Sequence, residues 1–269
     1  MSQPLDRMTE YHGALIKAAW VRAFDELTAQ IADTHAIVLL RGERGVGKDR
    51  MARVIHAAST RHDHPFVKMD CSTTPPDGLE SALFGHEKGA FPEAHRRKLG
   101  RVEFAHKGTV FLDEIGGFPP ALQPKVLRLL RERECVRIGS RDAIQVDVQV
   151  IAGTTESLTG TPRRDGPWES SDCLKVVDIH IPPLRERRDE IPALAALFLA
   201  RFNRHYGRSA ELSAEMLAMF AEYAWPGNVR ELETVVRRVA VTGDVSRIHE
   251  EIRSQLRHAA LAGKTSRSA

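Results

Sequence analysis

The sequence predicts an α/β protein in which helices cover both faces of a mostly parallel sheet, followed by a small all-helical part. Three observations carry this expectation. Short apolar runs rich in β-branched residues alternate with helical periodicity between residues 36 and 152. A glycine-rich turn joins the first apolar run to the helix that follows it. Beyond Pro182-Pro183 only helical periodicity remains.

The individual elements follow from the same patterns. We expect buried strands at residues 36–40, 66–69, 110–112 and 146–152. The helices expected beside them span residues 14–31, 51–58 and 121–133. In the helical part we expect helices at residues 191–206, 214–223 and 229–241, a last amphipathic helix from residue 244, and a frayed polar end at 263–269.

Composition narrows the class of protein. Hydrophobic residues make up 42% of the chain and charged residues 28%, and no run approaches the roughly 18 uncharged apolar residues of a membrane span. The N-terminus lacks a secretory signal, so we expect a cytoplasmic protein without a membrane partner. A net charge of +3 is too small to predict nucleic-acid binding, and three widely spaced cysteines do not predict disulfides.

The glycine-rich turn matches the phosphate-binding pattern G-x-x-x-x-G-K between a strand and a helix. Backbone N–H groups of such a loop close on phosphates, and its lysine reaches the β- and γ-phosphates of a nucleotide. The alternative is a glycine-rich turn with a chance lysine, which the flanking strand and helix disfavour. The residues expected to bind ATP are Gly42, Glu43, Arg44, Gly45, Val46, Gly47, Lys48 and Asp49.

Two carboxylates follow the apolar run at residues 109–112, where open α/β sheets bind ligands. Asp113 is expected to hold Mg²⁺, and Glu114 to orient and deprotonate the attacking water. Asp49 stands where the general motif has Ser or Thr on the metal, and its carboxylate is also a hard oxygen ligand. Asp113 and Asp49 are therefore the candidate metal ligands.

Several long motifs then appear in order. They are LFGHEKGAF at 83–91, GRVEFAHKGTVFLDEI at 100–115, PPLRER at 182–187 and WPGNVREL at 225–232. Together they resemble the central AAA+ domain of sigma-54-dependent transcription activators, the bacterial enhancer-binding proteins. The resemblance, from about residue 37 to about 241, implies a P-loop AAA+ three-layer sandwich with a helical lid. It further implies a ring of subunits that acts on sigma-54 RNA polymerase, with Arg230 touching the γ-phosphate.

The resemblance divides the chain into three parts. We expect residues 1–184 to form the AAA+ α/β nucleotide-binding domain and residues 185–243 the helical lid subdomain. Residues 244–269 should form a terminal helix and a frayed tail. We also expect no helix-turn-helix after the lid, and hence no direct DNA binding by this chain.

The chain departs from the family pattern in the loop that contacts sigma-54. Where the family continues Thr-Gly-Ala after Gly-Ala-Phe, this chain has Pro92-Glu93-Ala94. Proline fixes φ and removes an N–H, and Glu93 replaces a conformationally free glycine with a charge. Productive contact with sigma-54 is therefore expected to be impaired.

Further departures concern hydrolysis. The two arginines that reach the neighbouring subunit's ATP in the family align with Pro167 and Cys173, and Arg163 or Arg164 would substitute only after a backbone shift. Asp70 replaces the asparagine that restrains the catalytic glutamate, and Thr155 replaces another asparagine. The candidate catalytic residues are thus Glu114, Asp113 and Asp70.

The predicted function is an ATP-binding transcription regulator of this family that is weak or defective in hydrolysis and in sigma-54 contact. Its cofactors would be ATP and Mg²⁺, and its partner an RNA polymerase sigma factor or a related AAA+ activator in a homo- or hetero-oligomer. Two alternatives remain open. The chain is an active ATPase that remodels sigma-54 polymerase, or it is a binding module whose nucleotide site senses another ligand, such as a cyclic dinucleotide.

Overall fold

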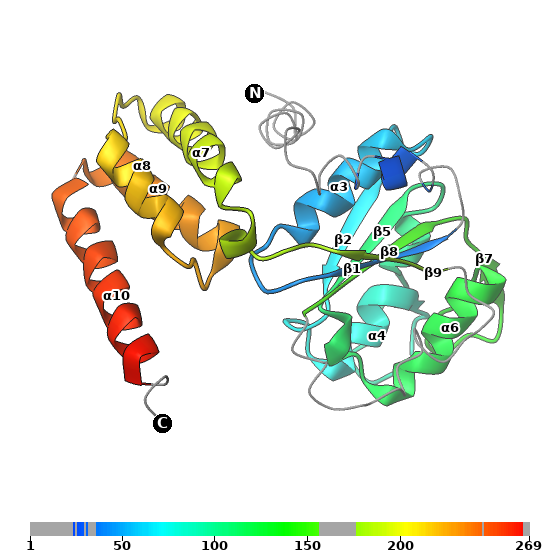
Figure 1. The fold of residues 1–269 in the computed structure, drawn as a ribbon. Helices are drawn as coiled ribbons and strands as arrows, with labels where there is room; N and C mark the ends of the chain where they lie inside the picture. Colours follow the sequence, from blue (N-terminus) through cyan, green and yellow to red (C-terminus); the bar gives the residue numbers. More distant parts are fainter. Residues whose placement is uncertain are drawn as a thin grey trace. The chain divides into compact units, whose positions relative to one another are not determined.

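A computed structural model describes residues 36–155, 176–243 and 245–265, together with Phe24, residues 26–29 and Ile31 (Figure 1). By its internal contacts the chain divides into two compact units. The first, the sheet unit, contains residues 24–43 and 48–181. The second, the helical unit, contains residues 182–269 together with the short segment Arg44–Gly47.

A five-stranded sheet forms the centre of the sheet unit. Its order is β2-β5-β8-β1-β9, and every neighbouring pair is parallel. The strands are β1 (Ile37–Arg41), β2 (Phe66–Asp70), β5 (Thr109–Asp113), β8 (Gln149–Thr154) and β9 (Val176–His180). The predicted α/β class with a mostly parallel sheet and a helical lid is confirmed.

Helices cover both faces of this sheet. Alternate residues of the strands, such as Val67, Val110 and Val150, pack with α4 (Pro76–Phe84), α5 (Arg101–Phe104) and α6 (Gln123–Glu132) in one buried core. On the opposite face α3 (Lys48–Ala58) packs against β1, β5 and β8 and buries Met51, Ala52 and Ile55 (Figure 1). The period-2 alternation of the strands thus separates two cores.

Two predicted elements have different bounds in the structure. The strand expected at residues 146–152 begins only at Gln149, because the Val146 N–H bonds to the Arg133 carbonyl (2.8 Å) and closes the hairpin of β6 (Glu134–Val136) and β7 (Ala143–Gln145). The helix expected at 121–133 opens as a 3₁₀ turn at Pro120–Leu122. It ends at Arg133, which adopts φ 56° as a left-handed cap.

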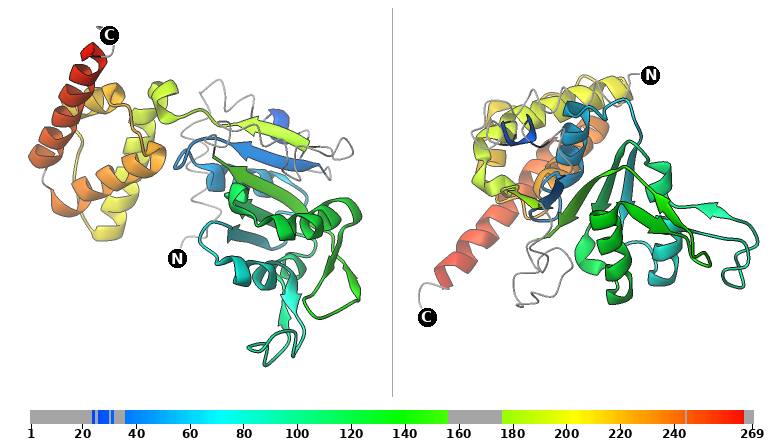
Figure 2. Two further views of the ribbon diagram at one scale, coloured as in Figure 1. Left: turned by 90° about the horizontal axis from the view of Figure 1, so that it is seen from below. Right: turned by 90° about the vertical axis from the view of Figure 1, so that its right-hand side faces the viewer.

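Several elements were not expected from the sequence. They include β9, the helices α4 and α5, the β6–β7 hairpin, and a second hairpin of β3 (Gly85–His86) and β4 (Lys98–Leu99). Figure 2 shows the β3–β4 and β6–β7 hairpins extending beyond the sheet, and a bridge between His86 and Ile138 joins them. Strand β9 has one buried side chain, Ile179, and exposed Asp178 interrupts its apolar residues, so no continuous apolar run marks it.

The helical unit contains α7 (Ile191–Tyr206), α8 (Ala214–Glu222), α9 (Asn228–Thr242) and α10 (Val245–Thr265). Gly207 ends α7 in the left-handed conformation, and the Ser213 hydroxyl caps α8 by accepting the Met216 N–H (3.1 Å). The last helix runs on to Thr265, past the expected fraying point at residue 263, and residues 266–269 lie outside the described part.

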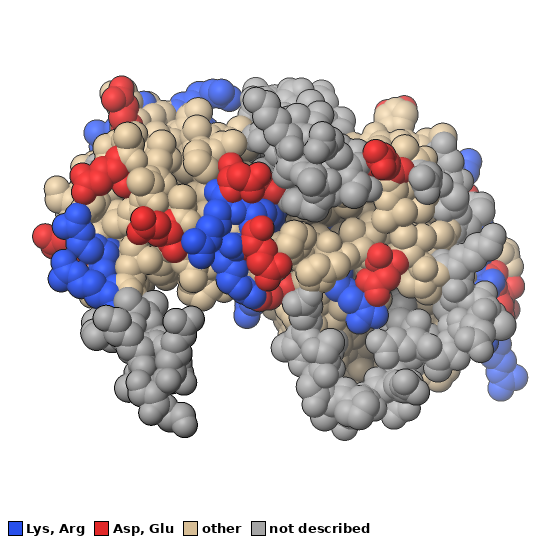
Figure 3. Space-filling model, viewed as in Figure 1, with Lys and Arg blue, Asp and Glu red and all other residues tan. Residues whose placement is uncertain are grey.

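The first predicted helix lies partly outside the described residues. Phe24, residues 26–29 and Ile31 are helical as predicted, whereas residues 14–23 of that helix lie outside the described residues. Across the parts of the chain that the structure describes, no helix is long and apolar enough to span a membrane. Figure 3 shows acidic and basic side chains interspersed on the visible face, as expected from nearly balanced charge.

Candidate functional site

The phosphate-binding pattern lies where β1 ends and α3 begins. Strand β1 stops at Arg41, and α3 starts at Lys48, so the six residues between them form the loop. Gly45 and Gly47 have φ angles of 84° and 110°, which a side chain would strain. The N–H of Gly42 donates to the Thr154 carbonyl (3.2 Å), which ties the loop to β8. The predicted strand, glycine loop and helix are thus present in sequence order.

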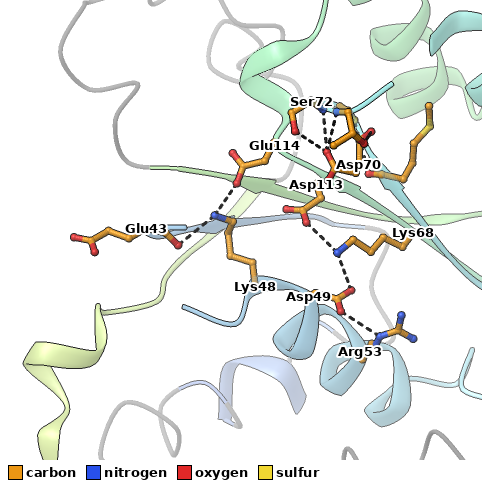
Figure 4. A network of polar contacts seen from close by, with 12 residues as sticks. Glu43, Lys48, Asp49, Arg53, Lys68, Asp70, Ser72, Asp113 and Glu114 are labelled. Atoms are coloured by element: carbon orange, nitrogen blue, oxygen red, sulfur yellow. Dashed lines mark hydrogen bonds and ion pairs between the residues drawn. The ribbon is translucent and has the colours of Figure 1, made fainter. Parts of the chain in front are cut away.

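Lys48 is buried at the base of this loop. Its Nζ donates to the carbonyls of Gly42 (2.9 Å) and Glu43 (3.5 Å) and lies 3.2 Å from Glu114 Oε1 (Figure 4). The side chain is only 5% exposed, whereas that of Glu114 is 26% exposed. A buried ammonium with two carbonyls and one carboxylate is well positioned to exchange these partners for phosphate oxygens.

Glu114 follows β5 in a conformation that is unusual for a residue other than glycine. Its φ and ψ are 55° and 53°, the left-handed region, and it precedes the 3₁₀ turn Ile115–Gly117. Its second carboxylate oxygen, Oε2, accepts a hydrogen bond from Thr155 Oγ1 (3.2 Å) at the end of β8. Strained backbone of this kind is often found at functional sites, and here it directs the Glu114 carboxylate toward Lys48.

Asp113 and Asp49, the two candidate metal ligands, are brought together by a third residue. Lys68 of β2 places its Nζ 3.1 Å from Asp113 Oδ2 and 3.5 Å from Asp49 Oδ1 (Figure 4). Arg53 also lies 3.6 Å from Asp49 on the next turn of α3. In the described ranges no three His, Cys, Asp or Glu side chains form a metal-binding group. Sequence reasoning missed Lys68.

Asp70 is held by the turn that follows β2, and its expected catalytic role stays a prediction. Its Oδ1 accepts hydrogen bonds from the Ser72 N–H (3.0 Å), the Ser72 hydroxyl (2.7 Å) and the Thr73 N–H (3.3 Å). Burial alone would raise the pKa of Asp70, but these hydrogen bonds and the charge of Lys68 hold it below the usual value. Asp70 is therefore an ionised cap of the turn after β2.

The tip of the loop, Arg44–Gly47, packs within the helical unit. The carbonyl of Gly45 accepts the Arg230 N–H (3.3 Å), and the carbonyl of Val46 accepts a hydrogen bond from the buried Arg187 guanidinium (2.8 Å). A Cβ atom on Gly45 would lie 2.4 Å from the Gly227 carbonyl, so only glycine fits there. The Arg230 side chain itself is exposed, and its expected contact with a γ-phosphate stays a prediction.

Asn228 is a second residue that sequence reasoning missed, although it lies inside the WPGNVREL motif. It is completely buried with φ 53°. Its Oδ1 accepts the Leu184 N–H (2.8 Å), and its Nδ2 donates to the Arg44 carbonyl (3.1 Å). A small amide that tolerates the left-handed conformation and bonds on both sides suits this position.

We expect Asn228→Ala to destabilise the helical unit by about 2–4 kcal/mol, because it leaves two buried backbone groups unsatisfied in a strained conformation. Urea denaturation followed by far-UV circular dichroism would measure this loss. Asn228→Gly should recover only the part of this loss that comes from the strained left-handed backbone. Gln255→Ala, an exposed change in α10, should shift stability by less than about 0.5 kcal/mol. Equal stability of Asn228→Ala and wild type would contradict this assignment.

The loop between β3 and β4 is closed by its own hydrogen bonds. The Gly89 N–H donates to the Ala94 carbonyl (2.8 Å), and the Ala94 N–H to the Phe91 carbonyl (2.9 Å). Phe91 packs edge-on against His86 at 4.8 Å between ring centroids. Pro92 and Glu93 are exposed at the tip of this loop.

The positions aligned with the family's arginine fingers are not described by the structure. Pro167 and Cys173, together with Arg163 and Arg164, lie in the range 156–175, outside the described residues. The alignment of Pro167 and Cys173 with the arginine fingers therefore stays a prediction from the sequence.

Comparison with known proteins agrees with the motifs. A family model described as the sigma-54 interaction domain matches residues 15–165, and one described as an AAA+ ATPase lid domain matches residues 185–269. The chain is 44% identical over 235 residues to a Nif-specific regulatory protein of Bradyrhizobium diazoefficiens, covering 87% of this chain and 40% of that protein. It is 45% identical over 213 residues to the formate hydrogenlyase transcriptional activator FhlA of Escherichia coli, covering 78% of this chain and 31% of that protein.

Among solved structures, NtrX from Brucella abortus in complex with ADP aligns with a TM-score of 0.75 and 29% identity, over 84% of this chain and 50% of that one. NtrX in complex with ATP aligns equally well. The chain thus spans about two fifths of the length of the Nif-specific regulator and half of NtrX. A model match over more than half of its residues shows that the chain belongs to the sigma-54 interaction domain family of AAA+ proteins.

Proposed function

We propose that this chain is an ATP-binding regulator of transcription that hydrolyses ATP slowly and contacts sigma-54 poorly. It would act in the cytoplasm through protein contacts, as a homo- or hetero-oligomer with related AAA+ activators or with an RNA polymerase sigma factor. The observation that carries this proposal is the pairing of buried Lys48 with Glu114 beneath a glycine loop of phosphate-binding geometry. Family membership supports the regulatory role.

ATP binding would use the loop and Lys48. The N–H groups of Gly42, Glu43, Arg44, Gly45, Val46, Gly47 and Lys48 would surround the phosphates, and NtrX has been solved with ADP and with ATP. The Lys48 ammonium would leave Glu114 for the phosphates, which are stronger acceptors than the two carbonyls it now contacts. Asp113 and Asp49 supply the hard oxygen ligands that suit Mg²⁺, which neutralises phosphate charge when bound.

Slow hydrolysis is supported by the groups around Glu114. One carboxylate oxygen of Glu114 accepts a hydrogen bond from Thr155, and Asp70 is engaged in its own turn. The sequence has Pro167 and Cys173 where the family has arginines. An arginine finger is worth about 10³ to 10⁵ in rate. A chain without fingers should therefore bind ATP but lose most of the transition-state stabilisation, about 4–7 kcal/mol.

Restoring the family's loop should restore the contact with sigma-54. We expect Pro92→Thr combined with Glu93→Gly to raise the affinity for purified sigma-54 by at least about tenfold in the presence of ATP. The substitution returns an N–H and a free glycine to an exposed tip and removes a negative charge. Surface plasmon resonance would measure the affinity for sigma-54. Glu211→Gly, which removes an exposed carboxylate elsewhere, should leave the affinity as it is in wild type.

The proposal as a whole is tested by assembly and transcription assays. Light scattering with and without ATP, alone and with a related activator, should show nucleotide-dependent association. Open-complex formation at a sigma-54 promoter, lost on Lys48→Ala, would instead establish an active remodelling ATPase. Tight binding of a cyclic dinucleotide by a chain with no affinity for ATP would overturn the proposal in favour of a ligand-sensing module.

A further inference from the structure

The ammonium group of Lys68 lies between the two carboxylates that are the candidate ligands for a divalent cation. These carboxylates come from different elements, Asp49 from the first turn of α3 and Asp113 from the end of β5 (Figure 4). Lys68 Nζ is 3.1 Å from Asp113 Oδ2 and 3.5 Å from Asp49 Oδ1. The same ammonium lies 5.6 Å from the centre of the Phe111 ring, which adds a cation–π contact. Three elements of the sheet unit thus converge on one fixed positive charge.

The arrangement is only partly buried. The Asp113 side chain is 16% exposed, that of Lys68 32% and that of Asp49 37%. Asp49 Oδ1 is buried and accepts no hydrogen bond among the described residues, so Lys68 and Arg53 supply its electrostatic compensation. Without Lys68, two carboxylates would face each other across a partly buried gap. Such a pair would gain strongly from any cation that replaced the ammonium.

Lys68 and a divalent cation would compete for the same oxygens. Mg²⁺ needs octahedral oxygen ligands at about 2.0–2.1 Å and dehydrates reluctantly. Asp113 could still offer its other oxygen to an ion, but an ion that bound Asp113 Oδ2 and Asp49 Oδ1 together would take the position that the ammonium now holds between them. The ion would therefore have to displace Lys68 before it reached both carboxylates.

We infer that Lys68 acts as a built-in counter-cation at the nucleotide site, so that ATP binding by this chain depends little on Mg²⁺. Lys68 compensates part of the charge of Asp49 and Asp113 in place of the ion and so weakens their repulsion of the phosphates. This inference rests on the proposed binding of ATP. It assigns a specificity to the site, namely similar affinity for ATP with and without its metal ion, which Lys68 sets by holding its two carboxylate partners.

The first arm of the test measures ATP affinity with Mg²⁺ and with EDTA. Wild type should change by less than about threefold, whereas Lys68→Met should lose at least about tenfold when Mg²⁺ is removed, since its two carboxylates then repel the phosphates. Lys68→Arg, which keeps the charge, should behave as wild type does. Lys125→Met removes a lysine paired with Glu80 on the helices and serves as the matched control. The same Mg²⁺ dependence in wild type and Lys68→Met would overturn the inference.

The second arm needs no nucleotide. Titration with Mn²⁺, followed by electron paramagnetic resonance, should reveal a bound ion in Lys68→Met that is lost on adding Asp113→Asn. Wild type and Lys68→Arg should show no such ion. Mn²⁺ bound as tightly by wild type as by Lys68→Met would sink the inference. Absence of ATP binding in all variants, with the Mn²⁺ site present only in Lys68→Met, would overturn the proposed function and support the competition by Lys68.

Discussion

Lys48→Ala should lower the affinity for ATP by at least about 100-fold. Its ammonium is buried beneath the glycine loop and bonds there to the Gly42 and Glu43 carbonyls, so it is a charge already held at the phosphate position. Charge-assisted contacts to phosphate in a site of low exposure are among the strongest that a side chain makes. Fluorescence titration with a labelled ATP analogue, in competition with unlabelled ATP, would measure the loss.

The controls for Lys48→Ala separate binding from folding. Because Lys48 is 6% exposed and paired with Glu114, its removal affects packing as well as binding. A thermal melt should show that the variant still unfolds cooperatively. Lys125→Ala, which removes a lysine on the opposite side of the sheet, should bind ATP as wild type does. Unchanged affinity in a folded Lys48→Ala protein would contradict phosphate binding by this loop.

Glu114→Gln should lower the turnover of ATP without lowering the affinity for ATP, in contrast to Lys48→Ala. Residual hydrolysis should fall by at least about 100-fold, because the amide cannot accept the proton of the attacking water. ATP affinity should stay equal or rise, because Lys48 loses the carboxylate that now competes for its ammonium at 3.2 Å. Single-turnover hydrolysis of radiolabelled ATP and the binding titration above would measure both effects on one preparation.

The matched control for Glu114→Gln is Glu132→Gln. Glu132 also pairs with a cation, Arg128, but at the end of α6 and away from the loop. This variant should match wild type in affinity and in turnover. Residual hydrolysis that survived Glu114→Gln at the wild-type rate would show that another group activates the water, and the role assigned to Glu114 would then be wrong.

The sequence located the loop, the strands beside it and the lid helices because each has a periodic signal. An apolar run marks β1, and the glycines and lysine after it mark the start of α3. In the three helices from residue 191, apolar residues recur at helical spacing. Strand β9 gave no such signal because exposed Asp178 interrupts its apolar residues and only Ile179 is buried. The two hairpins are too short for periodicity to register.

The site was harder to predict because its side chains are brought together by tertiary contacts. Asp70 was a candidate catalytic residue from the sequence, but only the fold shows that Ser72 and Thr73 of the following turn donate hydrogen bonds to it. Lys68 carries no motif, and only the parallel pairing of β2 with β5 places it against Asp113. Asn228 was part of a recognised motif, yet its left-handed backbone and two buried hydrogen bonds required the fold.

One measurement tests the central claim, that this chain holds ATP but turns it over slowly. The dissociation constant for ATP and the steady-state rate of phosphate release would be determined on the same purified sample, with Lys48→Ala as the blank. We expect a micromolar dissociation constant together with a turnover below about 0.01 s⁻¹, because the arginine fingers are missing. A turnover of about 1 s⁻¹ or faster, typical of working enzymes, would contradict it.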